Sequence, residues 1–315
     1  MKRALVIGAA GMIGRKLVER LEAEASELIL HDVVPPSGPA GARIVASDLS
    51  TPGEAEKLVA SRPDVIFHLA AIVSGEAEAD FEKGYRVNLD GTRLLFEAIR
   101  KQGYQPRVVF TSSIAVFGAP FPDAIGDEFL NAPLTSYGTQ KAIGELLLSD
   151  YSRRGFFDGI GIRLPTICVR PGKPNKAASG FFSGIIREPL AGQEAVLPVP
   201  KSVRHWHASP RAAIGFLMHA ATIDTAKLGT RRNLSMPGVS VTVGEQIEAL
   251  RKVAGEKAVK LIREQPDPVI QKIVEGWPRN FDPQRALSLG FRADPSFEEI
   301  IRIHVADELM VSKNA

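Results

Sequence analysis

Short apolar runs alternate with amphipathic segments along the first half of the chain. The apolar runs predict buried strands at residues 4–8, 27–32, 43–49, 64–71 and 107–113. Long amphipathic segments predict helices at residues 12–25, 85–103 and 136–154. Strands and helices that alternate in this way form a parallel sheet with helices on both faces. The pattern therefore predicts an α/β fold with a doubly wound parallel sheet.

Composition narrows the class of protein. The chain has 315 residues, of which 44% are hydrophobic and 24% are charged, as in ordinary globular proteins. Its net charge of +3, from 39 basic and 36 acidic residues, argues against a nucleic-acid-binding protein. Cys168 is the only cysteine, which excludes a disulfide framework and a cysteine-based zinc site. No apolar run approaches the roughly 20 residues that cross a bilayer, so we expect a cytoplasmic protein without a membrane partner.

A glycine-rich turn follows the first predicted strand. Gly8, Gly11 and Gly14 are spaced three apart, at the point where the helix starting near Met12 begins. Such a turn lets the backbone approach a pyrophosphate, and the positive end of the helix dipole points at that anion. Asp32 ends the second strand, 18 residues after Gly14, where a carboxylate accepts hydrogen bonds from ribose hydroxyls and repels a 2′-phosphate. The pattern predicts a Rossmann-like site that prefers NAD to NADP.

A tyrosine and a lysine share one face of the helix at 136–154. Tyr137 and Lys141 stand four residues apart in "SYGTQK", so their side chains point into the same space. A lysine ammonium beside a phenol lowers the pKa of that phenol from about 10 toward neutrality. Ser113 lies at the carboxyl end of the strand at 107–113, the edge where ligands bind in such sheets. These three side chains are candidates for a proton-transfer site, although Tyr137 and Lys141 alone also fit an ordinary helix.

These motifs resemble those of the extended short-chain dehydrogenases/reductases. The glycines, Asp32, "HLAA" (68–71), "NLDGT" (88–92), "TSSIAVFG" (111–118) and "SYGTQK" stand in that family's order and spacing over nearly the whole chain. The resemblance implies a dinucleotide-binding domain at 1–165 that carries the catalytic triad. It implies that 166–315 is mostly a substrate-binding lobe of α/β type, with some segments returning to the first domain. Phe117 departs from the family, where epimerases usually carry tyrosine, and we expect it to pack.

The resemblance also assigns roles to single residues. It implies that the catalytic triad is Ser113, Tyr137 and Lys141. It implies that NAD is bound by Gly8, Gly11, Met12, Ile13, Gly14, Asp32, Asp48, Leu49, Leu69, Ala70, Ala71, Asn88, Tyr137, Lys141, Pro165 and Thr166.

Within the family, the chain is most similar to a group of sugar-acid dehydrogenases. The segments that carry this similarity are 70–93, 161–193 and 202–213. Such enzymes oxidise the C2 hydroxyl of a four-carbon acid with NAD, so the expected reaction is D-erythronate to 2-dehydro-D-erythronate with Tyr137 as base. Binding a small carboxylate requires a cation or several donors. The candidates for substrate binding are Ser74, Lys173 and Arg204, together with Ser113 and Tyr137.

Other polar residues have structural interpretations. Arg163 ends a strand and is expected to form a structural ion pair, and Trp206 is expected to pack. His205 and His207 are expected to alternate across a strand or loop, so they need not share a target, and we predict no metal site. Arg170, Lys173 and Lys176 form a loose basic stretch that is expected to be solvated surface.

Two other classes of function use the same motifs. A nucleotide-sugar epimerase uses the same triad but keeps its NAD bound and binds a diphosphate. A non-catalytic NAD-binding regulator shares the fold without the chemistry, but it has no need of the triad. The helices at 85–103 and 136–154 resemble those that form the family's dimer interface, so we expect a homodimer.

Overall fold

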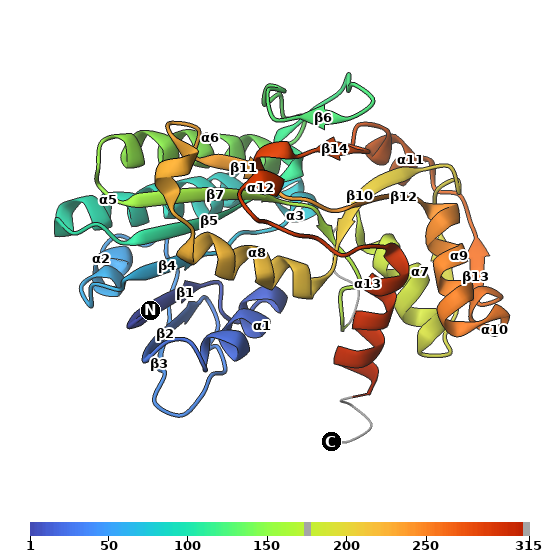
Figure 1. Cartoon of the computed structure of the whole chain (residues 1–315), viewed down its shortest axis with the longest axis horizontal. Helices are drawn as coiled ribbons and strands as arrows, with labels where there is room; N and C mark the ends of the chain where they lie inside the picture. Colours follow the sequence, from blue (N-terminus) through green and yellow to red (C-terminus); the bar gives the residue numbers. More distant parts are fainter. Residues whose placement is uncertain (173–177, 311–315) are drawn as a thin grey trace. The chain divides into compact units, whose positions relative to one another are not determined.

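The computed structural model describes residues 1–172 and 178–310, which form two compact units (Figure 1). Unit 1 comprises Met1–Val116, Pro133–Leu164 and Ile214–Ser235, and unit 2 comprises Phe117–Ala132, Pro165–Ala213 and the chain from Met236 onward. The main break after Leu164 lies next to the expected boundary at 165. The segment 117–132 nevertheless belongs to unit 2, and the segment 214–235 belongs to unit 1.

Unit 1 is built on a seven-stranded sheet in the order β11-β7-β5-β4-β1-β2-β3, and every neighbouring pair is parallel. Its strands are β1 (Arg3–Ile7), β2 (Glu27–Asp32), β3 (Arg43–Ala46), β4 (Val65–His68), β5 (Arg107–Ser113), β7 (Asp158–Leu164) and β11 (Asn233–Ser235). The predicted fold class is confirmed and all five predicted strands are present, although the strand expected at 43–49 ends at Ala46. The strand expected at 64–71 ends earlier, at His68, because the Leu69 and Ala70 N–H groups both bond to the Ile7 carbonyl and turn the chain out of the sheet.

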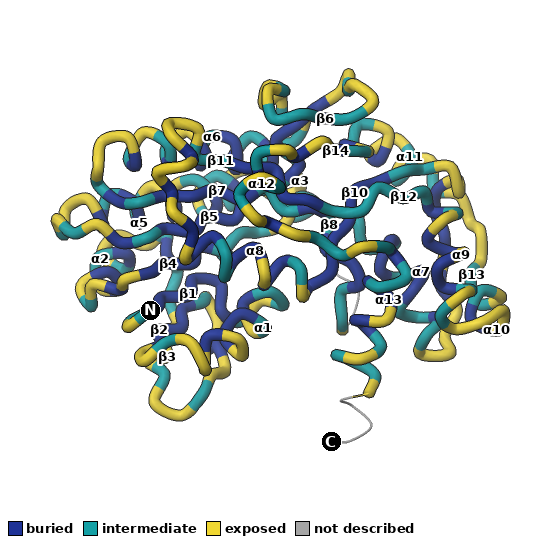
Figure 2. Tube along the Cα trace, viewed as in Figure 1, coloured by how far each residue is buried: buried dark blue, intermediate teal, exposed yellow. Residues whose placement is uncertain are grey.

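Helices cover both faces of this sheet. They are α1 (Met12–Leu21), α2 (Glu54–Val59), α3 (Ser74–Ala79), α4 (Phe81–Gly84), the π-helical η1 (Tyr85–Asp90), α5 (Gly91–Gln102), the 3₁₀ turn η2 (Ile114–Val116), α6 (Ser136–Arg153), α8 (Pro210–Thr222) and the 3₁₀ turn η3 (Thr225–Leu228). Figure 1 shows α5 and α6 on one face and α8 on the other. Except for the exposed edge strand β3, the strands are buried along most of their length (Figure 2), and Phe96, Phe110 and Leu148 lie in the core between the sheet and α5 and α6.

The helix predicted at 85–103 has two parts. Tyr85–Asp90 is π-helical and Gly91–Gln102 is α-helical, with Gly103 in the left-handed conformation after the last turn. A π-helical turn inside a helix is often found at a functional site. Here it contains the buried side chain of Asn88.

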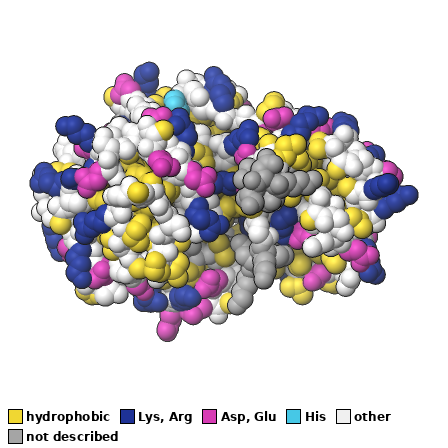
Figure 3. Space-filling view, turned by 90° about the horizontal axis from the view of Figure 1, so that it is seen from below, with side chains coloured by type: hydrophobic (Ala, Val, Ile, Leu, Met, Phe, Trp, Pro, Cys, Tyr) yellow, Lys and Arg dark blue, Asp and Glu magenta, His cyan; other side chains and the backbone are white. Residues whose placement is uncertain are grey.

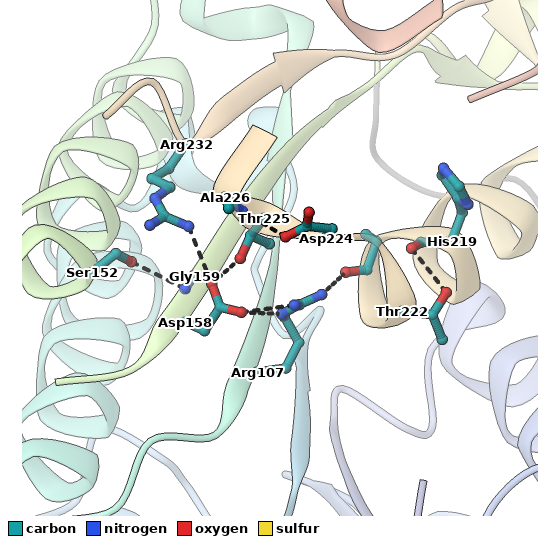
Figure 4. Close-up of polar contacts among 11 residues, drawn as sticks. Arg107, Ser152, Asp158, Gly159, His219, Thr222, Asp224, Thr225, Ala226 and Arg232 are labelled. Atoms are coloured by element: carbon teal, nitrogen blue, oxygen red, sulfur yellow. Dashed lines mark hydrogen bonds and ion pairs between the residues drawn. The ribbon is translucent and has the colours of Figure 1, made fainter. Parts of the chain in front are cut away.

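An ion cluster fixes the segment that returns to unit 1 (Figure 4). Asp158, at the start of β7, pairs with Arg107 of β5 and with Arg232, and it accepts a hydrogen bond from the Thr225 hydroxyl. Arg107 also donates to the Ala220 carbonyl in α8, 2.7 Å away. The cluster therefore ties α8 and the approach to β11 to the middle of the sheet.

Unit 2 contains three small sheets: β12-β10-β8, β13-β9 and β14-β6. Its strands are β6 (Ile125–Gly126), β8 (Thr166–Ile167), β9 (Ala195–Leu197), β10 (Arg204–Ala208), β12 (Val239–Thr242), β13 (Ile262–Glu264) and β14 (Phe281–Asp282). Its helices are α7 (Gly180–Leu190), α9 (Val243–Ala254), α10 (Glu256–Val259), α11 (Pro268–Glu275), α12 (Gln284–Ser288), α13 (Phe297–His304) and the π-helical η4 (Val305–Leu309). Phe182, Leu250 and Ile300 lie in the core of this unit.

The surface agrees with the nearly balanced composition. On the face shown in Figure 3, Lys and Arg side chains lie interspersed with Asp and Glu side chains. Within residues 1–172 and 178–310, no helix is long and apolar enough to cross a membrane.

Candidate active site

The direction in which the chain adds strands to the seven-stranded sheet reverses between β1 and β4. From β1 the chain moves outward to β2 and β3, then returns to β4 on the other side of β1. Ligands bind in open parallel sheets at such a switch point, outside the carboxyl ends of the strands. The glycine turn follows β1 and residues 69–71 follow β4, so both predicted cofactor segments lie at this edge.

The glycines of the turn are required by close backbone contacts. Gly8 has a φ of +94°, and a Cβ there would lie 2.7 Å from the Ala70 N. A Cβ on Gly14 would lie 2.1 Å from the Gly8 carbonyl oxygen. Gly11 is the N-cap residue of α1. Because Gly11 has no side chain, nothing from the cap residue lies between the turn and the first N–H groups of the helix, which start at Met12 and Ile13. The turn is thus a cradle for an anion at a helix N-terminus.

Asp32 lies beside the glycine turn. One carboxylate oxygen accepts from the Ala10 N–H at 2.9 Å and the other from the Val33 N–H at 2.7 Å. These bonds fix the carboxylate at the end of β2, partly exposed, next to the predicted pyrophosphate cradle. The position suits a ribose that extends from a pyrophosphate in the turn.

Asp48 and Leu49 differ in what they offer a cofactor. The Asp48 carboxylate pairs with Arg86, 2.5 Å away, and accepts a hydrogen bond from the Ser50 hydroxyl at 2.6 Å. Partial burial raises the pKa of the Asp48 carboxyl, but these bonds outweigh that effect and hold the pKa below its usual value. The Leu49 side chain is buried in the core of unit 1. Only the backbone of Leu49 is therefore free to border a cofactor.

Asn88 braces the loop after β4. Its amide oxygen accepts from the Ile72 N–H at 2.9 Å, and its amide nitrogen donates to the Ile72 carbonyl at 3.1 Å and to Gln140 Oε1 at 2.8 Å. These bonds join η1, α6 and the segment that follows Leu69, Ala70 and Ala71. Asn88 thus acts on this loop through Ile72.

Ser113 and Tyr137 belong to elements in direct backbone contact. Tyr137 is in the first turn of α6, where Thr135 caps the helix by accepting from the Gly138 N–H at 3.1 Å. A Cβ on Gly138 would lie 2.1 Å from the Ala115 carbonyl oxygen, so this turn is packed onto the chain just after β5. Ser113 ends β5, and its hydroxyl accepts from the Ala115 N–H at 3.1 Å. The contact at Gly138, which the sequence analysis did not single out, brings the two predicted hydroxyls to one edge.

Lys141 lies one helical turn further along, between α6 and β5. Its ammonium donates to the Thr111 carbonyl at 2.8 Å and lies 5.8 Å from the centre of the Tyr137 ring. The side chain is buried, and burial lowers the pKa of Lys141 to about 8, with Glu145 opposing the shift. The shared face of Tyr137 and Lys141 that the sequence predicts is confirmed.

Arg163 forms the structural ion pair that the sequence predicts. Its guanidinium binds both oxygens of the Glu145 carboxylate, at 2.8 and 2.7 Å, and one of these oxygens also accepts from the Ser112 hydroxyl at 2.5 Å. Glu145 was not among the residues predicted for the site. Its signal was present, because Glu145 follows Lys141 by four residues and therefore lies on the same helix face.

The remaining predicted site residues are distributed over both units. Ser74 is the first residue of α3 in unit 1, whereas Pro165 and Thr166 are in unit 2, where the Thr166 hydroxyl lies 2.7 Å from His205 Nε2. Arg204, in β10, pairs with Glu245 at 3.1 Å and donates to the Ser240 carbonyl at 3.0 Å. Lys173 and Lys176 lie outside the described residues.

Two expectations about unit 2 are wrong. His205 and His207 do not alternate across the strand: residues two apart in a strand lie on the same face, and both rings contact Phe182, with centroids 5.0 and 4.8 Å away. Arg170 is not a solvated surface residue, because its guanidinium is half-buried and donates to the Ile167 carbonyl and the Ser179 hydroxyl.

Two expectations about packing in unit 2 are confirmed. Trp206 and Phe117 are buried, as expected, and both rings pack against the Phe281 ring in a tilted arrangement. Burial lowers the pKa of His205 to about 3, so this ring is neutral. Within the described part of the chain, no three His, Cys, Asp or Glu side chains form a group that could hold a metal ion.

Comparison with known proteins defines the family. A family model described as the NAD dependent epimerase/dehydratase family matches residues 4–223. The chain belongs to this family, which confirms the predicted resemblance and NAD as the cofactor.

Individual relatives are more specific. The chain is 48% identical to D-erythronate dehydrogenase of Cupriavidus necator, covering 96% of this chain and 98% of the relative. It is 42% identical to D-erythronate dehydrogenase of Haemophilus influenzae, covering 95% and 98%. A crystal structure of a nucleoside-diphosphate-sugar epimerase from Agrobacterium tumefaciens has 68% sequence identity and a TM-score of 0.96, covering 98% of this chain and 95% of that one.

Proposed function

We propose that this protein is an NAD-dependent dehydrogenase that oxidises the C2 hydroxyl of D-erythronate to give 2-dehydro-D-erythronate. The names of two relatives that match nearly the whole chain support the substrate. The observation that carries the chemistry is the buried Lys141 ammonium, held on the Thr111 carbonyl of β5 and facing Tyr137 across one helical turn.

The residues at the carboxyl edge of unit 1 fit NAD. Gly8 and Gly14 allow close backbone contacts that any Cβ would break, and these contacts shape the turn at the N-terminus of α1, with Asp32 fixed beside it. We assign the pyrophosphate to Gly11, Met12 and Ile13. The adenosine ribose belongs to Asp32, and Asp48 and the Leu49 backbone border the adenine. Leu69–Ala71, held by Asn88 through Ile72, line the cofactor, and the resemblance adds Pro165 and Thr166 at the nicotinamide.

The chain's own groups handle the proton of the alcohol. NAD, when bound, supplies the acceptor for the hydride that leaves C2. Ser113 holds the substrate hydroxyl, and Tyr137, as tyrosinate, takes the hydroxyl proton, so that the C2–O bond becomes a carbonyl. Lys141 stabilises the tyrosinate by its positive charge. Hydride and proton together account for the two electrons and two hydrogens that the alcohol loses.

The charge state of Lys141 sets the upper pH limit. Its pKa of about 8 means that the stabilising cation is present below pH 8 and is lost as the pH rises through that value. Ionisation of Tyr137 requires the opposite change. We therefore expect kcat/KM to rise with pH through the Tyr137 ionisation and to fall above about pH 8.

Two cationic residues, Lys173 and Arg204, are the candidates for binding the substrate carboxylate. Ser74, at the start of α3, is proposed to bind a substrate oxygen, while Lys173 lies outside the described residues. Arg204 remains a candidate, but a substrate carboxylate would have to replace its ion pair with Glu245. An Arg204→Ala variant that raises KM for the acid and leaves NAD affinity unchanged would support the clamp.

A nucleotide-sugar epimerase is the second candidate. It is favoured by the name of the 68% identical solved structure. An epimerase returns the hydride to its substrate and so produces no net NADH. Incubation with NAD and a series of C4–C6 sugar acids, followed by NADH absorbance, separates the two. Stoichiometric NADH from D-erythronate supports the dehydrogenase; NADH from none of the acids, with epimerisation of a nucleotide sugar, overturns it.

The test of the mechanism is Tyr137→Phe. General-base catalysis is worth about 10²–10⁴-fold, so this variant is expected to lose at least about 100-fold in kcat while its fold and NAD affinity persist. Calorimetric titration with NAD provides the control. A variant that keeps most of the wild-type activity contradicts the proposed role of Tyr137. If the wild type itself has negligible activity, a non-catalytic NAD-binding regulator is the better account.

We also propose a cytoplasmic homodimer. The solvent-exposed side chain of Leu146 on α6, in the helix that the family resemblance places at the dimer interface, supports the dimer. The free thiol of the buried Cys168 fits a reducing compartment.

A further inference from the structure

Two opposite charges are buried on one face of α6. Lys141 is 3% exposed and Glu145, one helical turn later, is 1% exposed. Burying an ionised carboxylate is costly unless it is paired and hydrogen-bonded. Both buried groups therefore need partners that hold them in place.

The Glu145 carboxylate is fixed from the sheet side. Arg163 of β7 donates to both of its oxygens, and Ser112 of β5 donates to one. A bidentate guanidinium and a hydroxyl hold a carboxylate in place. The Glu145 carboxylate is thus fixed one turn behind Lys141.

The groups around Lys141 come from four elements. On α6 they are Tyr137 and Glu145; on β5 they are the Phe110 ring and the Thr111 carbonyl; on β4 it is His68; and on β7 it is Arg163, behind Glu145. His68 is neutral, because burial and the Lys141 charge lower its pKa to about 3. Glu145 is the carboxylate that opposes the effect of burial on Lys141.

The geometry points to Glu145 as a positioning residue for the oxidation: its carboxylate, fixed by Arg163 and Ser112, keeps Lys141 protonated beside Tyr137 at neutral pH. The inference rests on the proposed function for its catalytic consequence. Without Glu145, burial alone would act on Lys141, and the ammonium would lose its proton at a lower pH. Tyr137 would then lose its cationic neighbour within the working range.

The charge on Lys141 can be measured directly, without substrate or cofactor. Protein labelled with ¹³C-lysine is titrated by NMR, and the Lys141 ε-carbon signal is assigned by its loss in Lys141→Met. The wild type is expected to titrate near the pKa of about 8. In Glu145→Gln we expect the midpoint to fall by about one to two pH units, as for unit charges roughly 6–12 Å apart at an effective dielectric constant of about 20.

A double variant keeps the test decisive. Glu145→Gln removes the carboxylate that Arg163 binds and so risks unfolding, whereas Glu145→Gln/Arg163→Met removes both charges. Its Lys141 midpoint should also fall. The matched control is Asp150→Asn/Arg153→Met, an exposed ion pair on the same helix, which should leave the midpoint unchanged. A folded Glu145→Gln/Arg163→Met protein whose Lys141 midpoint is unchanged or raised overturns the inference.

The catalytic consequence is a second readout. The alkaline limb of kcat/KM should move to lower pH in the double variant by the same amount as the NMR midpoint. If the wild type makes no NADH from D-erythronate, the proposed function fails, but the NMR titration still tests Glu145. If the wild type makes NADH from D-erythronate but the Lys141 midpoint does not move in the double variant, the inference about Glu145 fails and the proposed function stands.

Discussion

Asp32 carries the choice between NAD and NADP at the scale of a single residue. Its carboxylate is oriented by the Ala10 and Val33 N–H groups, so a 2′-phosphate on the adenosine ribose would meet a fixed negative charge. The expected effect of this charge is a strong preference for NAD.

The Asp32→Asn variant tests this preference. Loss of charged hydrogen bonds to the ribose, worth about 1.5–3 kcal/mol, should lower kcat/KM for NAD by roughly 10–100-fold, and loss of repulsion should raise it for NADP. Initial rates with both cofactors give the ratio. Equal kcat/KM for the two cofactors in the wild type would contradict the role of Asp32.

Single residues also show where the sequence was insufficient. Arg204 is cationic and lies in the half expected to bind substrate, which made it a reasonable clamp. Its spacing could not show that Glu245, in the first turn of α9, and the Ser240 carbonyl engage its guanidinium. An ion-pair partner 41 residues away is a tertiary contact that local spacing does not encode.

At the scale of the element, two glycines position α6, because their lack of a side chain lets the helix pack closely against its neighbours. Gly138 packs against the Ala115 carbonyl, and a Cβ on Gly144 would lie 2.7 Å from the Phe110 ring. These contacts let the helix approach β5 closely enough for Lys141 to reach the Thr111 carbonyl. Periodicity predicted the helix, but not this approach.

A pair of glycine substitutions tests the approach. Gly138→Ala should destabilise the protein by about 1–3 kcal/mol through overpacking and should reduce kcat, because the first turn of α6 must move away from Ser113. Gly215→Ala, in α8 and with open space around its Cβ, is the control and should stabilise by about 0.5–1 kcal/mol through helix propensity. Urea unfolding and kcat measure both. Equal effects of the two substitutions would exclude the proposed contact.

At the scale of the whole molecule, the outer face of α6 predicts self-association. Leu146 is 70% exposed there, although an isolated exposed leucine is not unusual. We expect a dimer at micromolar concentration, and Leu146→Lys should shift it toward monomer because an interface cannot bury the new charge unpaired. Light scattering measures the mass, and Leu130→Lys, on an exposed site of unit 2, should leave it unchanged. A wild-type monomer at these concentrations is inconsistent with the proposed dimer.

The sequence by itself determined the parallel sheet, the glycine turn, Asp32, and the shared face of Tyr137 and Lys141. Each of these features depends on spacing along one element or one turn. Because strands and helices have fixed periods, such spacing can be recognised in the sequence. Only the tertiary structure decided which partners those groups have. Lys141 meets Thr111 of another element, Glu145 is held by Arg163 and Ser112 from two strands, and His205 and His207 turn one face of β10 toward Phe182. Such contacts join segments distant in sequence, so packing rather than local periodicity selects them.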